Sequence, residues 1–334
     1  MKQTPVTRRH ALRTLGALCA LPALALTAAA GAAQADSYPS KPIRLVVPFP
    51  PGGGTDMVGR LIAAHMGSAL GTTVVVENIA GATGTIGSSQ VARAAPDGYT
   101  LLLGITATHA IAPVIFPHLA YDPLRDFQPV GRLFYGGNVL VVNNAYPARD
   151  LKSLIALAKK PGADITYGSW GNGSGGHLSG EALNVAAGIH LRHVPYRGVS
   201  PMLTDLMGGT LQVAMADVTS SVPLIRTGKI RAIAVTGTQR SPAMPDVPTF
   251  AEAGGPAGTD SWYALFAPAK TPAPIVDKLE AALQAALRDP AMREQANNLG
   301  MRYAPQSRAD FTTQWRSDTQ TWTRLVKSSG AVAD

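Results

Sequence analysis

The chain has 334 residues, with 29 lysines and arginines against 21 aspartates and glutamates, which gives a formal charge of +8 at pH 7. The single cysteine excludes an intrachain disulfide framework and a cluster of thiolate metal ligands. The basic residues are too few and too dispersed for the basic face or stripe of a nucleic-acid-binding protein, so we expect no nucleic-acid partner.

The first 35 residues have the layout of an export signal, and we predict that residues 1–35 are a cleaved signal peptide. Four bases and no acid accompany an almost wholly apolar run from Leu15 to Ala33, and Ala33-Gln34-Ala35 offers small residues for cleavage. An uncleaved anchor is the alternative, because this apolar run could just span a bilayer. Pro22 and the small residues favour cleavage.

Removal of this leader places the mature chain in the periplasm. The pair Arg8-Arg9 resembles a twin-arginine signal, which leaves the export route open. The leader holds four of the 29 bases and none of the 21 acids, so the mature chain carries about +4. A modest positive field favours the approach of small anions.

After the leader, apolar runs of strand length alternate with segments of helical period, which predicts α/β architecture with parallel-rich sheets and helices on both faces. The first predicted group has strands at 43–49, 73–79 and 100–105 and helices at 56–70 and 84–94. A loop-rich stretch at 113–129 precedes a strand at 139–142 and a helix at 151–160. The second group has strands at 165–169, 192–196, 211–216 and 230–236 and helices at 176–187 and 200–207. A strand at 262–267 and helices at 275–288, 291–299 and 309–327 complete the chain.

The two α/β groups indicate two lobes facing each other across a cleft, because about 299 mature residues exceed one compact core. We predict that residues 36–140 and 264–334 form lobe 1 and residues 141–263 form lobe 2. The chain would then cross between lobes twice, near 139–143 and 261–268, and two crossings make a hinge.

Three loops that lead from a predicted strand into a predicted helix are rich in glycine or small polar residues. They are Pro48 to Asp56, Gly81 to Gly87 and Gly168 to His177. Glycine lets a ligand approach the backbone closely, and the following helix directs free N–H groups and its positive dipole end into the loop. Ligands of open α/β sheets bind at such strand ends, so each loop is a candidate anion site.

The first loop ends in Gly54-Thr55-Asp56 and lacks the lysine of a phosphate-binding P-loop. An aspartate here would repel a polyphosphate, and the prolines at 48, 50 and 51 supply no N–H donors. The donors would therefore come from Gly52 to Asp56, and a small carboxylate fits better than a nucleotide. A tight turn in which Asp56 complements the helix dipole is the alternative interpretation.

The third loop contains a Gly-x-Gly-x-x-Gly match at Gly171, Gly173 and Gly176, but no acid follows about 20 residues later. We therefore expect no dinucleotide cofactor. Neither a hydrolase Gly-x-Ser-x-Gly elbow nor a zinc-binding His-Glu-x-x-His helix occurs. We expect His177 and His193 to be structural groups.

Asp217 ends a predicted apolar strand and has two interpretations. It either binds an amino or hydroxyl group of a ligand or caps a helix that begins at Val218. An exported enzyme that uses His177 and Asp217 as acid and base remains an alternative function. The effector lobe of a transcription regulator is a further alternative, but such a protein would carry a helix-turn-helix where this chain has a leader.

Ordered motifs along nearly the whole mature chain resemble the periplasmic solute receptors of tripartite tricarboxylate transporters, the Bug receptors. The motifs are Tyr38-Pro39-x-Lys41-Pro42-Ile43-Arg44, Pro48-Phe49-x-Pro51-Gly52-Gly53-x-Thr55-Asp56, Val76-Glu77-Asn78-x-x-Gly81-Ala82-x-Gly84, Pro96-Asp97-Gly98-Tyr99-Thr100-Leu101, Gly168-Ser169-x-Gly171, His177-Leu178, His193-Val194-Pro195-Tyr196-Arg197-Gly198 and Pro245-Asp246-Val247-Pro248-Thr249.

This resemblance implies a two-lobed periplasmic binding fold of type II-like design, no catalysis, no cofactor and no metal. It implies a monomer that captures a small carboxylate and delivers it to membrane permease subunits, with sensing of the same ligands as the alternative role. The ligand would be an amino-acid-like diacid, a tricarboxylate or an aromatic acid. By the resemblance, the first lobe would hold a ligand carboxylate with Phe49, Gly53, Gly54, Thr55, Asp56, Gly81, Ala82, Thr83 and Gly84. The second lobe would close the other end with Ser169, Asn172, Ser174, Tyr196, Arg197 and Asp217.

Overall fold

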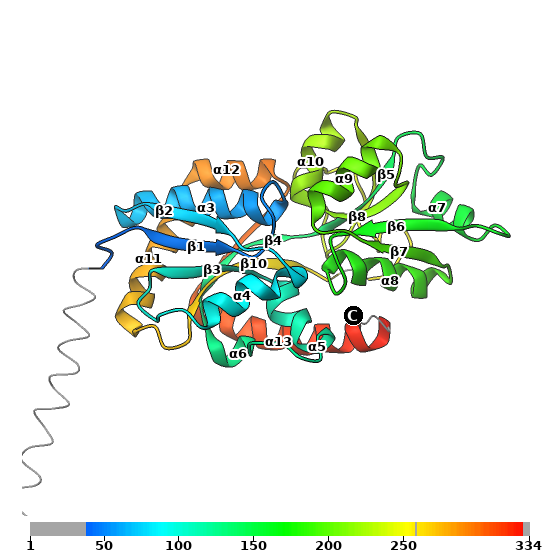
Figure 1. Ribbon diagram of the computed structural model, residues 1–334. Helices are drawn as coiled ribbons and strands as arrows, with labels where there is room; N and C mark the ends of the chain where they lie inside the picture. Colours follow the sequence, from blue (N-terminus) through cyan, green and yellow to red (C-terminus); the bar gives the residue numbers. More distant parts are fainter. Residues whose placement is uncertain (1–37, 258, 330–334) are drawn as a thin grey trace, which may run out of the picture.

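The computed structural model describes residues 38–257 and 259–329, so the predicted signal peptide and its cleavage site lie outside the described residues. Two sheets organise the described chain (Figure 1). The six strands of the first sheet are β1 (Ile43–Val47), β2 (Val74–Asn78), β3 (Thr100–Ile105), β4 (Phe127–Gly136), β10 (Ser261–Pro268) and β11 (Arg302–Gln306), in the spatial order β11-β4-β10-β3-β1-β2. The five strands of the second sheet are β5 (Asn138–Asn143), β6 (Ile165–Ser169), β7 (Leu191–Pro195), β8 (Val213–Asp217) and β9 (Ile230–Val235), in the order β7-β6-β8-β5-β9.

Helices cover both faces of each sheet, and we call each sheet with its helices a lobe (Figure 1). The helices of the first lobe are α3 (Gly54–Leu70), η1 (Ala82–Gly84), α4 (Thr85–Ala92), η2 (Ala107–Ile111), α5 (Ala112–Ile115), α6 (Pro123–Asp126), α11 (Ala273–Arg288), α12 (Pro290–Asn298) and α13 (Arg308–Ser329). The helices of the second lobe are α7 (Leu151–Ala158), α8 (Gly175–Ala187), α9 (Val199–Gly208) and α10 (Val218–Arg226). The predicted α/β class with two helix-covered sheets is confirmed.

Successive side chains along each strand point to opposite faces of the sheet, so each sheet packs against two hydrophobic cores. In β1, Ile43, Leu45 and Val47 pack with α3 and α11, while Val46 faces the opposite layer that contains η2 and α13. Successive strand residues point to opposite faces, so a strand buried on both faces reads as one apolar run. The same division occurs in β5, where Val139 packs toward α9 and Leu140 toward α7 and α8.

We predicted sheets made mainly of parallel strand pairs, and this part of the prediction is wrong because both sheets are mixed. The pairs β1–β2, β1–β3, β6–β7 and β6–β8 are parallel, whereas β10 is antiparallel to β3 and β4, β11 to β4, and β5 to β8 and β9. The antiparallel pairs come from the strands that pass between the sheets and from β4 and β11, which the sequence pattern did not predict.

The strands β4 and β11 were missed because each contains a proline, which usually marks a loop. Pro129 of β4 pairs with Phe266 next to a shift in register, and the pairing of β11 with β4 shifts between Tyr303 and Gln306, around Pro305. Proline is tolerated in sheets at such irregularities and at edges, where its missing N–H interrupts no regular ladder. The helix α10 was predicted only through the interpretation in which Asp217 caps a helix that begins at Val218, and Pro223 lies inside it.

The chain passes from the first sheet to the second at Gly137, between the end of β4 and the start of β5. It returns between β9 and β10. The two passages are tied together at the second sheet, because Asn138 N donates to Thr236 Oγ1 at 2.9 Å and Thr236 N donates to Asn138 O at 2.8 Å. The two connections therefore run side by side where the lobes meet.

Candidate functional site

A cavity lies between the two lobes at the carboxyl ends of their parallel strands, and its space of about 700 Å³ includes a part open to solvent. Small-molecule sites in proteins often lie at such interlobe positions. Its lining from the first lobe is Phe49, Pro50, Gly53, Gly54, Thr55, Ile105, Thr106, Ala107, Ile111, Gly136, Ser261, Trp262 and Tyr263. Its lining from the connection and the second lobe is Gly137, Asn138, Trp170, Gly175, Gly198, Val199, Ser200 and Asp217.

The helix α3 begins at this cavity without a side-chain cap. Its N-cap is Gly53, which has no side chain to accept a hydrogen bond, and Gly54 and Thr55 form the first turn. The first N–H groups of a helix have no partner inside the helix, and together with the dipole they attract anions. The first predicted loop therefore offers free backbone donors to the cavity.

A second uncapped helix, α9, begins on the opposite wall. Its N-cap Gly198 has a φ of 120° and no side-chain cap, and Val199 and Ser200 of its first turn also line the cavity. Gly198 and Pro50 face each other across the lobes, since a Cβ on Gly198 would lie 3.1 Å from Pro50 Cγ. Two uncapped helix N-termini, one from each lobe, thus flank the same space.

Two further α-helices that begin at the cavity, α8 and α10, are capped by the side chains of their N-cap residues. Ser174 caps α8 by accepting a hydrogen bond from His177 N, and Asp217 caps α10 by accepting one from Ser220 N at 2.8 Å. Both interpretations of Asp217 thus have a structural basis, because the same carboxyl group caps α10 and lines the cavity.

The surroundings of Asp217 are unusual for a carboxyl group. The residue is only 8% exposed, its Oδ2 is buried without a hydrogen-bond partner, and it is the one charged side chain among the described residues that line the cavity. Burial raises its pKa, although the backbone and side chain of Ser220 act in the opposite direction. Desolvation penalises the charged form of a group, and a positive or hydrogen-bond-donating partner would offset that penalty.

Contact between Asp217 and α3 shows how closely the lobes approach. A Cβ built on Gly54 would lie 2.1 Å from Asp217 Oδ1 and 3.0 Å from Thr219 Cβ. Only glycine at position 54 permits this approach. Tyr263 adjoins the same contact, and burial and the nearby Asp217 charge raise the pKa of Tyr263, while the hydroxyls of Thr219 and Thr55 lower it.

The carboxylate of Asp56 is occupied within its own loop. Its Oδ2 accepts hydrogen bonds from Gly52 N and Arg60 Nε at 3.0 Å each, and its Oδ1 accepts one from Asn78 Nδ2 at 3.0 Å. Burial tends to raise the pKa of Asp56, but these hydrogen bonds outweigh it and hold the pKa below the ordinary value. Asp56 therefore shapes the loop, and it does not line the cavity.

The second predicted loop lies outside the cavity lining and bridges the lobes instead. Thr83 Oγ1 donates to the backbone oxygen of Asn172, across the lobes, at 2.7 Å. Ala82 and Thr83 have φ values of 43° and 52°, a left-handed conformation that strains residues with a side chain. Gly81 and Gly84, with φ of 137° and 91°, flank this turn, and Gly84 lies beside the Phe49 ring.

The polar residues of the third loop hold that loop together behind the cavity wall. Ser169 is fully buried, its hydroxyl lies 2.6 Å from His193 Nε2, and Ser174 Oγ donates to it at 3.2 Å. His177 accepts a hydrogen bond from Gly173 N, and its ring stacks on that of His193. Burial and the neighbouring His177 lower the pKa of His193 to about 4. His177 does not line the cavity, so the two members of the hypothetical acid–base pair are not brought together there.

Tyr196 and Arg197, which precede α9, also lie outside the lining. Tyr196 OH donates to Asp205 Oδ2 at 2.9 Å, and burial followed by this contact raises the pKa of Tyr196 to about 12. Arg197 is exposed. Of the fifteen residues proposed from the resemblance, the cavity is lined by Phe49, Gly53, Gly54, Thr55 and Asp217.

Several lining residues were not singled out in the sequence. The α9 turn at Gly198 carried the same signal as the first loop, namely a glycine between a strand and a helix, and could have been found by the same argument. Thr106, Asn138, Trp170 and Tyr263 carried no such signal, because their positions depend on how the two sheets meet.

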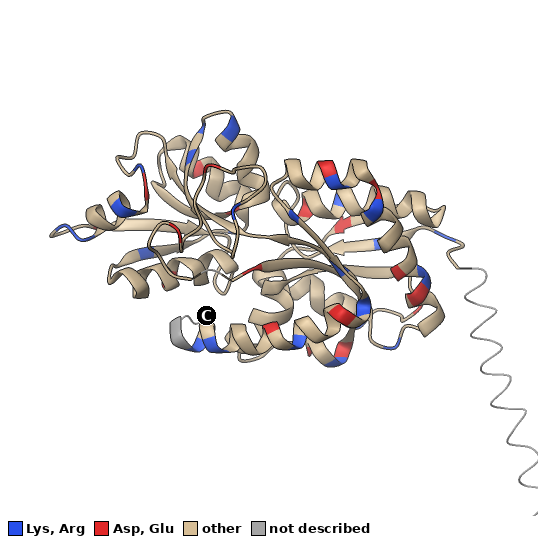
Figure 2. Cartoon of the chain, turned by 180° about the vertical axis from the view of Figure 1, so that it is seen from behind, with Lys and Arg blue, Asp and Glu red and all other residues tan. Residues whose placement is uncertain are grey.

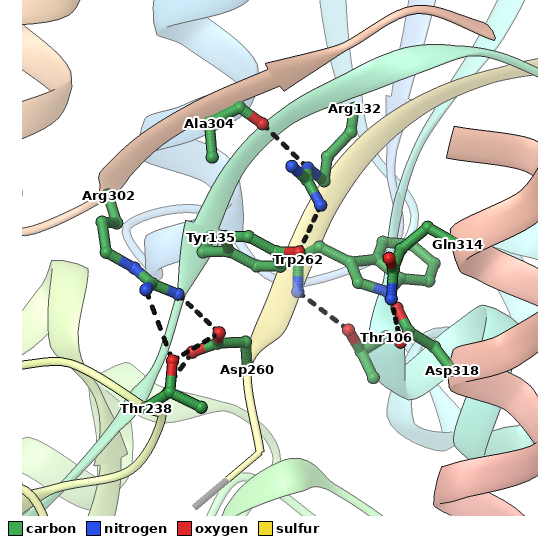
Figure 3. A network of polar contacts seen from close by, with 10 residues as sticks. All are labelled: Thr106, Arg132, Tyr135, Thr238, Asp260, Trp262, Arg302, Ala304, Gln314 and Asp318. Atoms are coloured by element: carbon green, nitrogen blue, oxygen red, sulfur yellow. Dashed lines mark hydrogen bonds and ion pairs between the residues drawn. The ribbon is translucent and has the colours of Figure 1, made fainter. Parts of the chain in front are cut away.

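A polar network lies at the junction of the lobes (Figure 3). Asp260 forms an ion pair of 2.7 Å with Arg302 of β11 and accepts hydrogen bonds from the backbone and hydroxyl of Thr238, which follows β9. Beside it, Trp262 N donates to Thr106 Oγ1 at 2.8 Å, and the indole donates to Asp318 of α13 at 3.0 Å. The start of β10 is thus fixed in the first lobe, while Thr238 connects it to the second.

In the described ranges, no cluster of three or more histidine, cysteine or acidic side chains is arranged to hold a metal ion. Within those ranges there is also no helix with the length and apolar character that a membrane span requires. Charges of both signs are interspersed on the side of the molecule that Figure 2 shows.

Two α/β lobes joined by paired connections, with helix N-termini converging on the cavity between them, define a two-lobed solute-binding protein. Residues 58–331 match the family model described as tripartite tricarboxylate transporter family receptor. The chain belongs to this family of solute receptors.

Solved structures of relatives match nearly the whole described chain. The R. palustris protein Rpa4515 with adipate is 34% identical with a TM-score of 0.85, and the comparison covers 89% of this chain and 100% of that one. The periplasmic binding protein BugD is 36% identical with a TM-score of 0.84, with coverages of 89% and 100%. MatC from Rhodopseudomonas palustris with bound malate is 35% identical with a TM-score of 0.80, with coverages of 86% and 100%.

Proposed function

We propose that this protein captures a small carboxylate in the periplasm by closure of its two lobes and delivers it to the permease of a tripartite tricarboxylate transporter. The observation that carries this proposal is the pair of uncapped helix N-termini, α3 and α9, that face one cavity from opposite lobes. The adipate and malate in the two relatives are carboxylates and support the same ligand class. The protein performs no turnover and acts as a monomer.

Backbone amides hold the carboxylate in this proposal, because the described residues that line the cavity include no lysine or arginine. The free N–H groups of Gly54 and Thr55 bind one face of the ligand, and those at the start of α9 bind the other. Such donors are fixed in place by their helices and lose little conformational freedom when a ligand binds. A ligand that contacts both lobes only in the closed arrangement stabilises that arrangement.

A thermal-shift panel tests this function. Small mono-, di- and aromatic carboxylates are expected to raise the melting temperature of the leader-free protein, and neutral sugars of similar size are not. At a ligand concentration of 100 times the dissociation constant, the stabilisation is about 2.7 kcal/mol. A panel in which several sugars stabilise the protein and no carboxylate does would refute the proposal.

Gly54→Ala supplies the matched variant for this panel. Alanine favours the helix but places a methyl group against Asp217 and Thr219, so the lobes fold and closure is blocked. Overpacking costs about 1–3 kcal/mol, so affinity is expected to fall roughly tenfold or more. Gly208→Ala is the control, because a Cβ there has open space around it. Equal carboxylate affinity in both variants would place the ligand outside the α3 turn.

A further inference from the structure

The charge on the cavity wall restricts which carboxylates fit. Among the described residues that line the cavity, Asp217 is the one ionisable acid and no basic side chain accompanies it, so its ionised form is negative and unbalanced. By the proposed function, on which this inference rests, the ligand adds a second negative charge in the same desolvated space. Two such charges repel each other unless a positive or hydrogen-bond-donating group lies between them.

The two oxygens of Asp217 are used differently. Oδ1 accepts the hydrogen bond from Ser220 N that caps α10, whereas Oδ2 is buried and has no hydrogen-bond partner. A buried acceptor without a donor is costly, and native proteins rarely leave one unsatisfied without a functional reason. Among the described residues none donates to Oδ2, so a ligand in the cavity can supply this donor.

The position of Asp217 sets where on the ligand this donor lies. Its carboxyl group packs against Gly54, in the first turn of α3, where the free N–H groups are. A ligand carboxylate held by this turn is therefore a close neighbour of Asp217. A donor attached to the carbon next to that carboxyl group, or one carbon further, can lie between the two.

We propose that Asp217 makes the protein selective for carboxylates that carry an amino or hydroxyl group beside the carboxyl group. An amino group binds more tightly than a hydroxyl, because an ammonium both donates to Oδ2 and balances the charge of Asp217. Unsubstituted acids of the same skeleton bind most weakly.

Three matched series test this selectivity by isothermal titration. They are propionate, lactate and alanine; succinate, malate and aspartate; and phenylacetate, mandelate and phenylglycine. Each series keeps one skeleton and changes hydrogen to hydroxyl to ammonium. In the series whose skeleton fits, the amino acid is expected to bind at least about tenfold more tightly than the unsubstituted acid, the gain typical of a hydrogen bond to a charged group.

The variant Asp217→Asn tests whether the preference for amino over unsubstituted acids depends on Asp217. Asparagine keeps the helix cap but removes the charge, so the ratio of affinities between amino and unsubstituted acid is expected to shrink to roughly threefold or less. Asp150→Asn is the control, because Asp150 caps α7 and does not line the cavity. That variant keeps the wild-type ratio.

The outcomes separate this inference from the proposed function. If the members of a bound series have equal affinities, or Asp217→Asn keeps the wild-type ratio, the selectivity proposal is overturned while carboxylate binding stands. If no member of any series binds and the wider carboxylate panel also fails, the receptor proposal itself fails.

Discussion

At the scale of single residues, the carboxyl group of Asp217 combines a structural and a binding position. It caps α10 with one oxygen and leaves the other buried and unpaired at the cavity. A residue placed for binding in this way is expected to lower the stability of the ligand-free protein. Because burial raises the pKa of Asp217, this loss of stability depends on pH and can be measured.

Burial raises the pKa of Asp217 in the folded protein above its unfolded value of about 3.9. Between these two pKa values the folded state binds more protons than the unfolded state, so the free energy of unfolding falls as pH rises through this window. Asp217→Asn keeps the cap without the charge. We expect it to raise the melting temperature at pH 7, by on the order of 1 kcal/mol of stability, with the gain shrinking toward pH 4.

For Asp150→Asn we expect the change in stability to depend on pH in the opposite direction. Hydrogen bonds from the backbone and side chain of Ser153 lower the pKa of Asp150, so its carboxylate contributes stability above its unfolded pKa that is lost as pH falls. Calorimetry of both variants from pH 4 to pH 8 checks the pair. A melting temperature of Asp217→Asn that stays below wild type across the whole range would contradict the account.

The sequence alone identified some of these residues but could not decide what each one does. Gly54 and Asp217 were found because each stands where a predicted strand meets a helix. Whether Asp217 caps a helix or faces a ligand could not be decided from the pattern, since one oxygen caps α10 while the unpaired Oδ2 and the contact with Gly54 become visible only when the two lobes are placed together. For Asp56 the sequence predicted a backbone N–H donor or a carboxylate that complements the helix dipole, and packing alone shows that this carboxylate accepts hydrogen bonds from Arg60 and Asn78.

At the scale of elements, α8 of the second lobe contacts the first lobe. Leu178 is 5% exposed and packs in the cluster of the first lobe that contains Phe311, Trp315 and Trp322 of α13. This contact and the Thr83–Asn172 hydrogen bond join the lobes beside the cavity. In the proposed closure of the lobes, the α8–α13 contact stabilises the closed arrangement.

Leu178→Ala is expected to weaken carboxylate binding severalfold while each lobe keeps its fold, because most of the lost burial belongs to the closed state. Removing a buried leucine side chain to alanine costs about 2–5 kcal/mol when the site is fully buried. Leu183→Ala is the matched control, since Leu183 lies on the same helix in the core of the second lobe. It should lower the melting temperature without a specific loss of affinity, as titration and thermal unfolding together would show. Equal losses of affinity would contradict a role for α8 in closure.

Element prediction succeeded where periodicity was regular and failed where proline stands inside an element. The central strands of both sheets and the long helices were predicted within a few residues, because burial on both faces produces continuous apolar runs. β4 and β11 were missed since their prolines are accommodated by register shifts that only the paired strands reveal.

At the scale of the whole molecule, the cavity exists because two sheets meet at the carboxyl ends of their parallel strands. The α/β alternation in the sequence predicts two such sheets, and the glycine turns predict where anions bind. The pairing of α3 with α9 across the cavity could not be predicted, because it depends on the orientation of one lobe against the other. The predicted lobe boundaries at 140/141 and 263/264 stay a prediction.

The central claim is that backbone N–H groups of the uncapped α3 turn hold a ligand carboxylate between the lobes. A crystal structure of the leader-free protein with its tightest-binding carboxylate tests this most directly. The account predicts a carboxylate oxygen within hydrogen-bonding distance of the N–H groups of Gly54 or Thr55, with the start of α9 on its other side. A bound solute elsewhere, with the α3 turn facing only water, would contradict it.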